Sequence, residues 1–294
     1  MTYTMVWRPA REQEDLPDEP YDVWRTYEGD VSSSFHRIPD GFYVRFNDCG
    51  DFSINLTTRE VLYFPVPDVP EDYSENLFSN QILPLLWTYD GMPVLHASAV
   101  VIDGGAFAFL GQSGRGKSTL AAAMARAGFP FLTDDGLLLE QKNVGFSVKP
   151  YLPSIRLLPD SENAVLGKTL ADINPDDDVY KARVPSSDLI PFTGREMPLV
   201  AVFVLIEPTA SQPTFVQLSQ AAAIDALLQH SFLLDSRDKA RVLNYFGIMA
   251  AVAEACPLIA LDYPRDFSQL GSLTTAIAAH ARSILDLSSK RCLT

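Results

Sequence analysis

The sequence predicts a mixed α/β fold in which a small β-rich domain precedes a core built around a phosphate-binding loop. Three observations predict it. Residues 111–118, GQSGRGKS, stand between an apolar segment and an Ala-rich one. Residues 198–207, PLVAVFVLIE, are almost fully apolar, which is typical of a strand buried on both faces. Residues 32–65 form short alternating segments between turn signals, which is typical of an antiparallel meander.

The N-terminal domain is predicted to span residues 1–91. Residues 1–30 are rich in Pro, Asp and Glu, and we expect them to be extended or weakly ordered. After the meander, residues 70–91 carry an apolar face at helical spacing, which predicts a helix. Pro84 stands inside this helix and is expected to kink or shorten it, because proline has no backbone N–H to donate.

The core domain is predicted to span residues 92–287, with 288–294 as a tail. The predicted strands are 94–103, 106–111, 129–135, 136–141, 144–150, 198–207 and 257–264, and the predicted helices are 117–128, 219–231, 236–255 and 266–285. Residues 150–195 are expected to be irregular, because they contain many prolines and an acidic run. A loop-rich segment of this length is more often functional than structural.

Composition excludes several classes of function. The net charge is −14 and the pI is about 4.6, so the surface disfavours nucleic acid and anionic membranes and favours a cationic partner. The three cysteines show no CxxC spacing, which argues against a zinc site or a disulfide framework. No apolar run is long enough for a membrane span and no signal-peptide pattern opens the chain, so we predict a cytoplasmic protein without a membrane partner.

Residues 111–118 meet the pattern G-x-x-x-x-G-K-[ST] between a predicted strand and a predicted helix. The glycines let the backbone wrap an anion, and the N–H groups at the helix start point at phosphates. Lys117 would place a positive charge on the phosphate oxygens, and the Ser118 hydroxyl would ligate Mg²⁺. The predicted nucleotide-binding residues are Gly111, Gln112, Ser113, Gly114, Arg115, Gly116, Lys117, Ser118 and Thr119.

Two adjacent acids, Asp134 and Asp135, close the strand that follows the helix. A parallel strand–helix–strand unit would return both of them beside the phosphates. Adjacent side chains of an extended strand point to opposite sides, so one carboxylate can hold the metal while the other faces an acceptor hydroxyl. Alternatively, one of the two acids only forms a turn before Gly136. His96 opens the strand pair before the loop and is, taken alone, more typical of a packed residue than of a catalyst.

The stretch from about 94 to 140 contains LHASAVVIDGG, GQSGRGKS and FLTDDG, and it resembles the catalytic core of the HPr kinase/phosphorylase family. The similarity continues more loosely to about 283. The resemblance implies a P-loop core of the HPr kinase and phosphoenolpyruvate carboxykinase type, with ATP and Mg²⁺ as cofactors. It also implies active-site roles for His96, Lys117 and Asp134, with Asp135 as the proton acceptor.

Some positions depart from the family pattern. Thr119 stands where the family has Glu, and PYLPSIRLLPDSENA replaces the glycine-rich RGxGI signature. Asp160 stands roughly where the family keeps a second metal carboxylate, so the predicted metal ligands are Ser118, Asp134 and Asp160. Arg156, Lys181 and Arg183 are candidate phosphate contacts.

The departures are closer to the smaller HPr kinase-related proteins, some of which phosphorylate a serine of a lasso-peptide precursor. By this resemblance, the partner is a peptide or small protein with an acceptor serine. The N-terminal domain and residues 150–195 would bind it. Bifunctional members of the family form hexamers, so a homo-oligomer is compatible with the resemblance, although the sequence does not choose an assembly state.

Other classes of function stay open at this point. A nucleotide-hydrolysing or nucleotide-sensing regulator would use the apolar strand that ends at Glu207 as its acidic element. A small-molecule kinase would share the loop and the acids. A scaffold that binds nucleotide only for support would not need Lys117, Ser118 and Asp135 together.

Overall fold

The fold is described by a computed structural model that covers residues 2–16, 18–26, 28–167 and 181–291. The chain divides into two compact units. Unit 1 comprises Met1–Leu86 with Asp235–Val242, and unit 2 comprises Trp87–Leu234 with Leu243–Thr294. The chain therefore passes between the units three times. No prediction anticipated that the segment Asp235–Val242 would group with the N-terminal residues.

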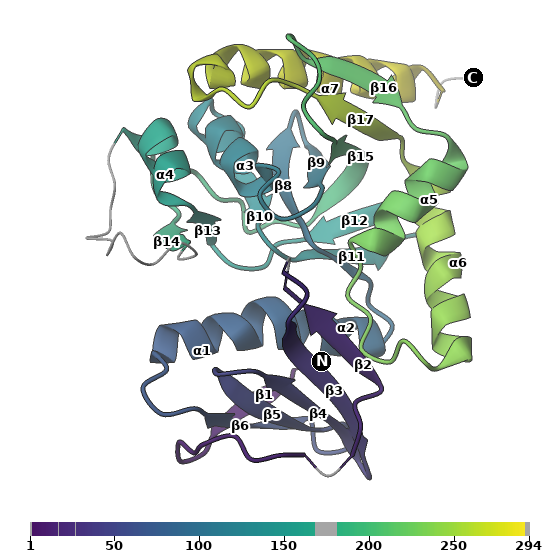
Figure 1. The fold of residues 1–294 in the computed structure, drawn as a ribbon. Helices are drawn as coiled ribbons and strands as arrows, with labels where there is room; N and C mark the ends of the chain where they lie inside the picture. The colour runs from purple at the N-terminus through teal and green to yellow at the C-terminus, as the bar shows by residue number, and fades with distance from the viewer. Residues whose placement is uncertain (1, 17, 27, 168–180, 292–294) are drawn as a thin grey trace. The chain divides into compact units, whose positions relative to one another are not determined.

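Unit 1 contains a six-stranded sheet in the order β1-β6-β5-β4-β3-β2 (Figure 1). The strands are β1 Thr4–Trp7, β2 Asp22–Arg25, β3 Val31–Ile38, β4 Gly41–Phe46, β5 Gly50–Asn55 and β6 Glu60–Pro65. The antiparallel meander predicted for residues 32–65 is confirmed as β3 to β6. The first thirty residues are more regular than predicted, because β1 pairs in parallel with β6 and β2 pairs antiparallel with β3.

The helix predicted over 70–91 is confirmed as three consecutive segments: α1 Glu71–Leu77, the π-helical η1 Phe78–Ile82 and α2 Leu83–Tyr89. The backbone N–H of Leu83 donates to the carbonyl of Phe78, five residues earlier. Pro84 has no N–H to continue an α-helical pattern, and the wider π turn lies just before it, so the continuous α-helical segments are shorter than the predicted helix. Helix α1 is joined to the sheet by a 2.7 Å hydrogen bond between the Ser74 and Tyr63 hydroxyls.

Asp51 ties the N-terminal segment to the sheet of unit 1. Its buried carboxylate accepts hydrogen bonds from Gln13 at 2.9 Å, from the Tyr43 hydroxyl at 2.7 Å and from Arg45 at 2.8 Å. Burial by itself raises the pKa of Asp51, but these donors, Arg45 foremost, hold it below its ordinary value. The composition of the first thirty residues gave no hint of this anchor.

The segment Asp235–Val242 is bound to unit 1 by polar contacts. Arg37 donates to Asp235 at 2.6 Å, and the Ser236 hydroxyl donates to Asp22 at 2.6 Å. The guanidinium of Arg37 also lies 5.4 Å from the ring centre of Tyr21. These contacts link a segment late in the chain to strands β2 and β3.

Unit 2 contains a nine-stranded mixed sheet in the order β10-β8-β9-β15-β12-β11-β7, with β17 pairing β15 and β16 pairing β17. Its strands are β7 Val94–Leu95, β8 Ala97–Ile102, β9 Gly105–Leu110, β10 Phe131–Thr133, β11 Leu137–Gln141, β12 Phe146–Lys149, β15 Met197–Leu205, β16 Thr214–Gln217 and β17 Leu258–Asp262. Its remaining helices are α3 Lys117–Arg126, α4 Pro159–Leu166, α5 Gln220–Gln229, α6 Lys239–Ala255, η2 Phe267–Gln269 and α7 Leu270–Arg291; part of α6 belongs to unit 1. The predicted order of strands and helices is confirmed, but β13, α4, β14 and β16 were not predicted.

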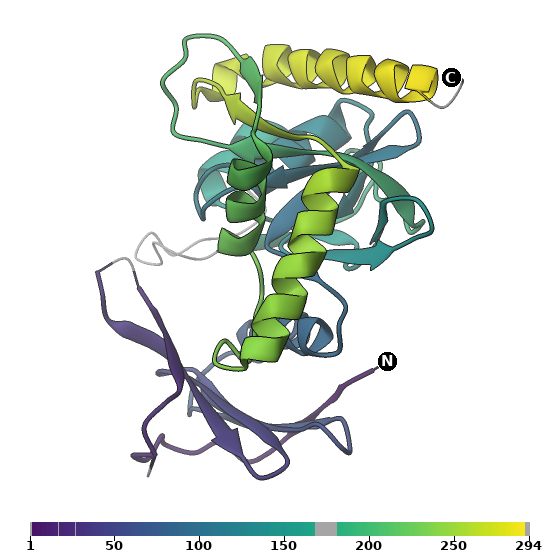
Figure 2. The ribbon, with the colours of Figure 1, turned by 90° about the vertical axis from the view of Figure 1, so that its right-hand side faces the viewer.

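Two apolar cores lie on opposite faces of this sheet, because successive side chains of a strand point to opposite sides. Phe107 and Phe109 of β9 pack with α3 and α7 on one face. Ala106, Ala108 and Leu110 pack with α5 and α6 on the other. Figures 1 and 2 show these two helical layers. Strand β15 is buried over most of its length, as its apolar composition predicted.

The segment 150–195 is more regular than predicted. Two strands, β13 Ser154–Leu157 and β14 Ala182–Pro185, form an antiparallel pair in which Arg156 is opposite Arg183. Helix α4 follows β13 directly, with Pro159 in its first turn. The many prolines had favoured an irregular prediction, but Pro159 is compatible with the start of a helix. The acidic run of this segment lies outside the described residues.

The route from β9 through α3 to β10 skips one strand. Both β9 and β10 pair antiparallel with β8, which lies between them, so β9 and β10 run in the same direction. The predicted parallel strand–helix–strand unit is therefore present with a strand inserted in its middle. This topology places the end of β10 at the same sheet edge as the loop that follows β9.

Replacing Asp51 with Ala should destabilise unit 1, because it leaves the partly buried Arg45 guanidinium without its carboxylate. Loss of one partner of a buried ion pair costs about 3–5 kcal/mol. Since the pKa of Asp51 is lowered in the folded state, its contribution should be full at neutral pH and disappear as the pH falls below about 4. Urea unfolding of the two proteins at neutral and acid pH measures both effects.

The matched control is Asp103→Asn, which removes an exposed partner of Arg282 and should change stability little. Equal unfolding midpoints for wild type and Asp51→Ala would contradict the anchoring role of Asp51.

Candidate nucleotide and phosphoryl-transfer site

The loop between β9 and α3 has the backbone that its glycines allow. Gly111, Gly114 and Gly116 have φ values of 155°, 77° and 90°, a region in which residues with a Cβ are strained. Gly116 is the residue before α3, so the free N–H groups at the start of that helix follow it directly. Such a helix start favours an anion.

Lys117 is buried, and its ammonium group lies over its own loop. It donates to the carbonyl oxygens of Gly111 at 2.8 Å and Gln112 at 3.2 Å. An ammonium has three N–H donors, and these bonds use two of them. Burial is the main cause that lowers the pKa of Lys117 to about 8, and the charge of Asp135 opposes it.

The residues that follow β17 contact the phosphate-binding loop and hold its backbone. The Tyr263 hydroxyl donates to the carbonyl of Arg115 at 3.2 Å, and the guanidinium of Arg265 donates to the same oxygen. Arg265 also donates to the Ile206 carbonyl at 3.0 Å. The side chain of Arg115 is bound outside the loop, in an exposed ion pair with Glu207. Tyr263 and Arg265 were not predicted, because no local pattern links them to the loop.

Asp134 and Asp135 are both buried at the end of β10. Asp135 has φ 60°, a left-handed conformation that Asp tolerates, and Gly136 closes the turn with an N–H donated to the Asp134 carbonyl at 2.8 Å. Strand β10 ends at Thr133, so the prediction that the two acids stand on an extended strand is wrong: both follow the strand, and Asp135 is left-handed. Because the chain turns there, Arg156 contacts both carboxylates.

Asp134 is surrounded by hydrogen-bond donors. Its carboxylate accepts from the Ser98 hydroxyl at 2.5 Å and from the backbone N–H of Arg156 at 2.9 Å, and the Ser118 side chain adds a third bond. Burial, followed by the nearby charge of Asp135, raises the pKa of Asp134 to about 6. Ser98, the second residue of β8, was missed in the sequence.

Asp135 has the opposite pKa shift. Burial by itself would raise its pKa, but the basic side chains around it lower the pKa below its ordinary value. These neighbours are, in order of effect, His96, which acts only when it is protonated, and Lys181, Arg156 and Lys117. The Arg156 guanidinium donates to Asp135 at 3.2 Å. The carboxylate is therefore ionised at neutral pH in a basic environment.

His96 is close to Asp135, with 4.0 Å between its Nε2 and a carboxylate oxygen. Burial, then the charge of Lys117, lowers the pKa of His96 to about 4, so its imidazole is neutral at pH 7. Its backbone N–H donates to the carbonyl of His230 at 2.8 Å, and burial together with Lys117 also lowers the pKa of His230 to about 4. His230 follows α5 and had no sequence signal; only the fold brings it here.

Asp160 and Thr119 lie at neighbouring helix starts. The Thr119 hydroxyl donates to Ser161 at 2.9 Å, which joins the first turns of α3 and α4. Asp160 is exposed in the first turn of α4 and is not among the hydrogen-bond partners of Asp134 described above. Its role as a second metal ligand stays a prediction.

The oxygen donors present fit a Mg²⁺ ion. A carboxylate and a hydroxyl, Asp134 and Ser118, are hydrogen-bonded to each other beside the loop. In the described part of the chain no cluster of three or more His, Cys, Asp or Glu side chains could hold a metal. Mg²⁺ characteristically takes one or two protein carboxylates and completes its shell with water and phosphate oxygens.

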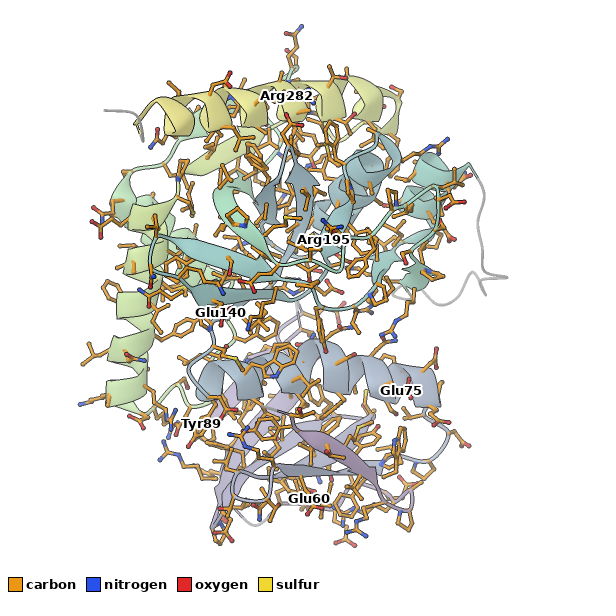
Figure 3. All side chains as sticks on the ribbon, turned by 180° about the vertical axis from the view of Figure 1, so that it is seen from behind. Glu60, Glu75, Tyr89, Glu140, Arg195 and Arg282 are labelled. Carbon is orange, nitrogen blue, oxygen red and sulfur yellow. The ribbon has the colours of Figure 1, made fainter. Side chains whose placement is uncertain are left out.

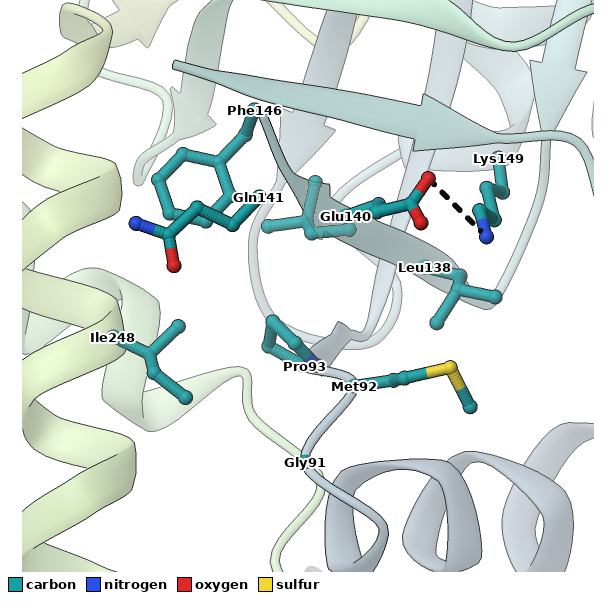
Figure 4. A pocket seen from close by; sticks show the side chains of 10 residues that line it. Gly91, Met92, Pro93, Leu138, Glu140, Gln141, Phe146, Lys149 and Ile248 are labelled. Atoms are coloured by element: carbon teal, nitrogen blue, oxygen red, sulfur yellow. Dashed lines mark ion pairs between the residues drawn. The ribbon is translucent and has the colours of Figure 1, made fainter. Parts of the chain in front are cut away.

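Two cavities of unit 2 lie away from these residues. One, of about 120 Å³, is lined by Met92, Leu138, Glu140 and Ile248 among others, with Glu140 paired to Lys149 at 3.2 Å (Figure 4). A second, of about 700 Å³, is lined by Phe215 and His280, whose rings stack at 4.3 Å. None of the predicted site residues lines either cavity.

Comparisons with known proteins give a distant structural likeness. No protein-family model matches the chain, and no curated protein matches it. Among solved structures, the chain is similar to the Hpr(Ser) kinase/phosphatase from Coxiella burnetii, with 14% sequence identity and a TM-score of 0.39. The match covers 68% of this chain and 97% of that chain. A likeness of this extent assigns no residue and no reaction.

Among the described residues, no helix combines the length and apolar character needed to cross a membrane. The predicted cytoplasmic location stays a prediction.

Replacing Gly116 with Ala should weaken the binding of ADP about tenfold. A Cβ at φ 90° is strained by roughly 1–2 kcal/mol and would stand 3.0 Å from the Tyr263 hydroxyl, so the N–H groups at the start of α3 would shift. Isothermal titration calorimetry measures the affinity. Gly247→Ala on α6 is the matched control, since a Cβ there meets open space. Unchanged ADP affinity in Gly116→Ala would contradict the loop as the binding element.

The Mg²⁺ dependence of nucleotide affinity should weaken as the pH falls through about 6, because Asp134 becomes protonated there and cannot ligate the ion. Ser98→Ala removes a donor that favours the ionised carboxylate, so the loss should occur at higher pH. Mg²⁺ titrations at several pH values measure both. Ser272→Ala, an exposed serine that donates to the Gln269 carbonyl, is the control. A Mg²⁺ requirement that is flat through pH 6 would exclude Asp134 as a ligand.

Proposed function

We propose that the protein is an ATP- and Mg²⁺-dependent kinase of the HPr kinase-like P-loop type, which transfers the terminal phosphate to a hydroxyl group. The observation that carries this proposal is the position of Asp135. This buried carboxylate is paired with Arg156, and the charges around it, which include that of Lys117 from the phosphate-binding loop, lower its pKa. A loop that only binds or hydrolyses a nucleotide does not need a second acid at this place.

Each group then has a defined task. Backbone N–H groups of the loop and Lys117 bind the phosphate oxygens. Asp134 and Ser118 would hold Mg²⁺, which neutralises the charge that develops on those oxygens. Asp135 would accept the proton of the acceptor hydroxyl while the hydroxyl oxygen forms a bond to the terminal phosphorus. The bond from that phosphorus to the bridging oxygen breaks, and ADP leaves with the bridging oxygen. Neutral His96 beside Asp135 can orient the hydroxyl.

The proposed acceptor is a serine of a peptide or small protein. The net charge of −14 supports a cationic acceptor, since opposite charge speeds encounter. The resemblance to the HPr kinase-related proteins supports a ribosomal precursor peptide, such as that of a lasso peptide. A small-molecule kinase would use the same loop and the same acids.

A nucleotide-hydrolysing or nucleotide-sensing regulator is the second candidate. Its acidic element would be Glu207, at the end of the apolar strand β15. The carboxylate of Glu207 is mostly exposed and is paired with Arg115, whereas Asp134 is hydrogen-bonded to Ser118. This difference favours the kinase.

Replacing Asp135 with Asn should reduce phosphoryl transfer by about 10²- to 10⁴-fold while ATP affinity changes by no more than a few-fold, because the proton acceptor is lost and the loop is kept. The assay combines ATP, Mg²⁺ and a library of basic serine-containing peptides, with mass spectrometry for peptides that gain one phosphate. Calorimetry with ATP reports binding separately.

Two variants bracket this result. Lys117→Met should weaken nucleotide binding itself, and Asp103→Asn, at the exposed turn between β8 and β9, should leave transfer unchanged. Transfer that survives in Asp135→Asn would exclude Asp135 as the proton acceptor. Release of inorganic phosphate without any phosphopeptide would favour the regulator.

A further inference from the structure

We propose that Arg156 binds the terminal phosphate of the nucleotide directly, as a second cationic group besides Lys117, through its Nε–H. This inference rests on the proposed function only in that the loop binds a nucleoside triphosphate. It assigns to one side chain a role that distinguishes ATP from ADP.

Arg156 is tied to both acids by different parts of the residue. Its backbone N–H donates to Asp134 at 2.9 Å, and Nη1 of its guanidinium donates to Asp135 at 3.2 Å. Strand β13 fixes the backbone through its pairing with β14. The side chain is about three-quarters buried, with an exposed fraction of 27%. A guanidinium held in this way has little freedom to turn elsewhere.

One donor of this guanidinium is left over. Within the described residues, the Nε atom of Arg156 is buried and has no hydrogen-bond partner. A buried N–H of a charged group without an acceptor is costly, and such a group in a native protein calls for an acceptor from outside the chain. The guanidinium is planar and presents its donors as a fork that matches phosphate oxygens.

The surroundings favour a phosphate over other acceptors. Asp134, which the Arg156 backbone holds, is hydrogen-bonded to Ser118 of the loop, and Asp135, which the guanidinium holds, is influenced by Lys117. The terminal phosphate would lie among these groups and would bring more negative charge to the Arg156 guanidinium than Asp135 alone does. The α- and β-phosphates would contact the loop itself, so Arg156 should matter little for ADP.

The test compares the affinities of ADP and of the β,γ-imido analogue of ATP, each with Mg²⁺, by calorimetry. Replacing Arg156 with Gln should weaken binding of the ATP analogue about 10- to 100-fold, the usual effect of a lost charged hydrogen bond, and change ADP affinity by less than about threefold. Arg156→Lys keeps the charge without the Nε–H and should fall between Gln and wild type. The substitutions keep the backbone bond to Asp134.

Arg282→Gln is the matched control, because Arg282, which lies on α7, also pairs with an aspartate at 2.9 Å (Figure 3). Its partner Asp103 precedes β9, whereas the loop follows that strand. Both affinities should be unchanged. If Arg156→Gln weakens the binding of ADP and of the ATP analogue equally, or weakens the binding of neither, the proposal is wrong.

An indirect effect is separated by repeating the substitution in an Asp135→Asn background. If Arg156 only offsets the charge of Asp135, its replacement there should no longer weaken the ATP analogue, and the proposal fails. If it binds the phosphate, the 10- to 100-fold loss should persist. Should Arg156→Gln unfold, Arg156→Lys in the same background gives the answer.

These measurements need no acceptor, so they are independent of the kinase assay. A selective loss of affinity for the ATP analogue in Arg156→Gln, without any phosphopeptide in the kinase assay, would support the phosphate-binding role of Arg156 and refute the kinase. Phosphopeptide formation, together with no selective loss of affinity for the ATP analogue in Arg156→Gln, would support the kinase and refute the role of Arg156. A wild-type protein that binds neither nucleotide refutes both.

Discussion

The burial of two neighbouring carboxylates at the end of β10 is the constraint on which the rest of the site depends. Two such groups cannot both stay ionised in a poorly solvated place unless donors and cations compensate them. The chain meets this requirement unequally. Asp134 is compensated by hydrogen bonds and still has a raised pKa, whereas Asp135 is compensated by charges and has a lowered one. This asymmetry gives two chemically similar side chains different properties.

The donors that compensate the acids come from widely separated parts of the sequence. Ser98 belongs to β8, Ser118 to the loop after β9 and Arg156 to β13. They meet because β8 lies between β9 and β10, so the loop and the acids share one edge of the sheet. The site is therefore a product of strand order more than of any single motif.

Much of unit 2 could be predicted from the sequence, because its signals are local. A run of apolar residues predicts β15, and the glycines of the loop predict its unusual backbone. The turn at Asp135 has a local signal, because Asp before Gly136 is typical of a turn, but the apolar run before it favours a strand that continues through both acids. His230 and Tyr263 reach the site through tertiary packing, which leaves no trace in the residues around them. In unit 1 the composition of the first segment predicts an extended or weakly ordered chain, because its partner, Asp51, lies far along the sequence.

The assignment of Asp235–Val242 to unit 1 has a consequence for anyone who wishes to take the protein apart. A fragment that stops after α2 would lack Asp235 and Ser236, which bind Arg37 and Asp22. Since the polypeptide passes between the units three times, a protease cut after Leu86 would leave the segment Asp235–Val242 of unit 1 covalently attached to unit 2. The two units are thus not modules that gene truncation can separate, and exchanging one of them between relatives would require grafting an internal segment as well.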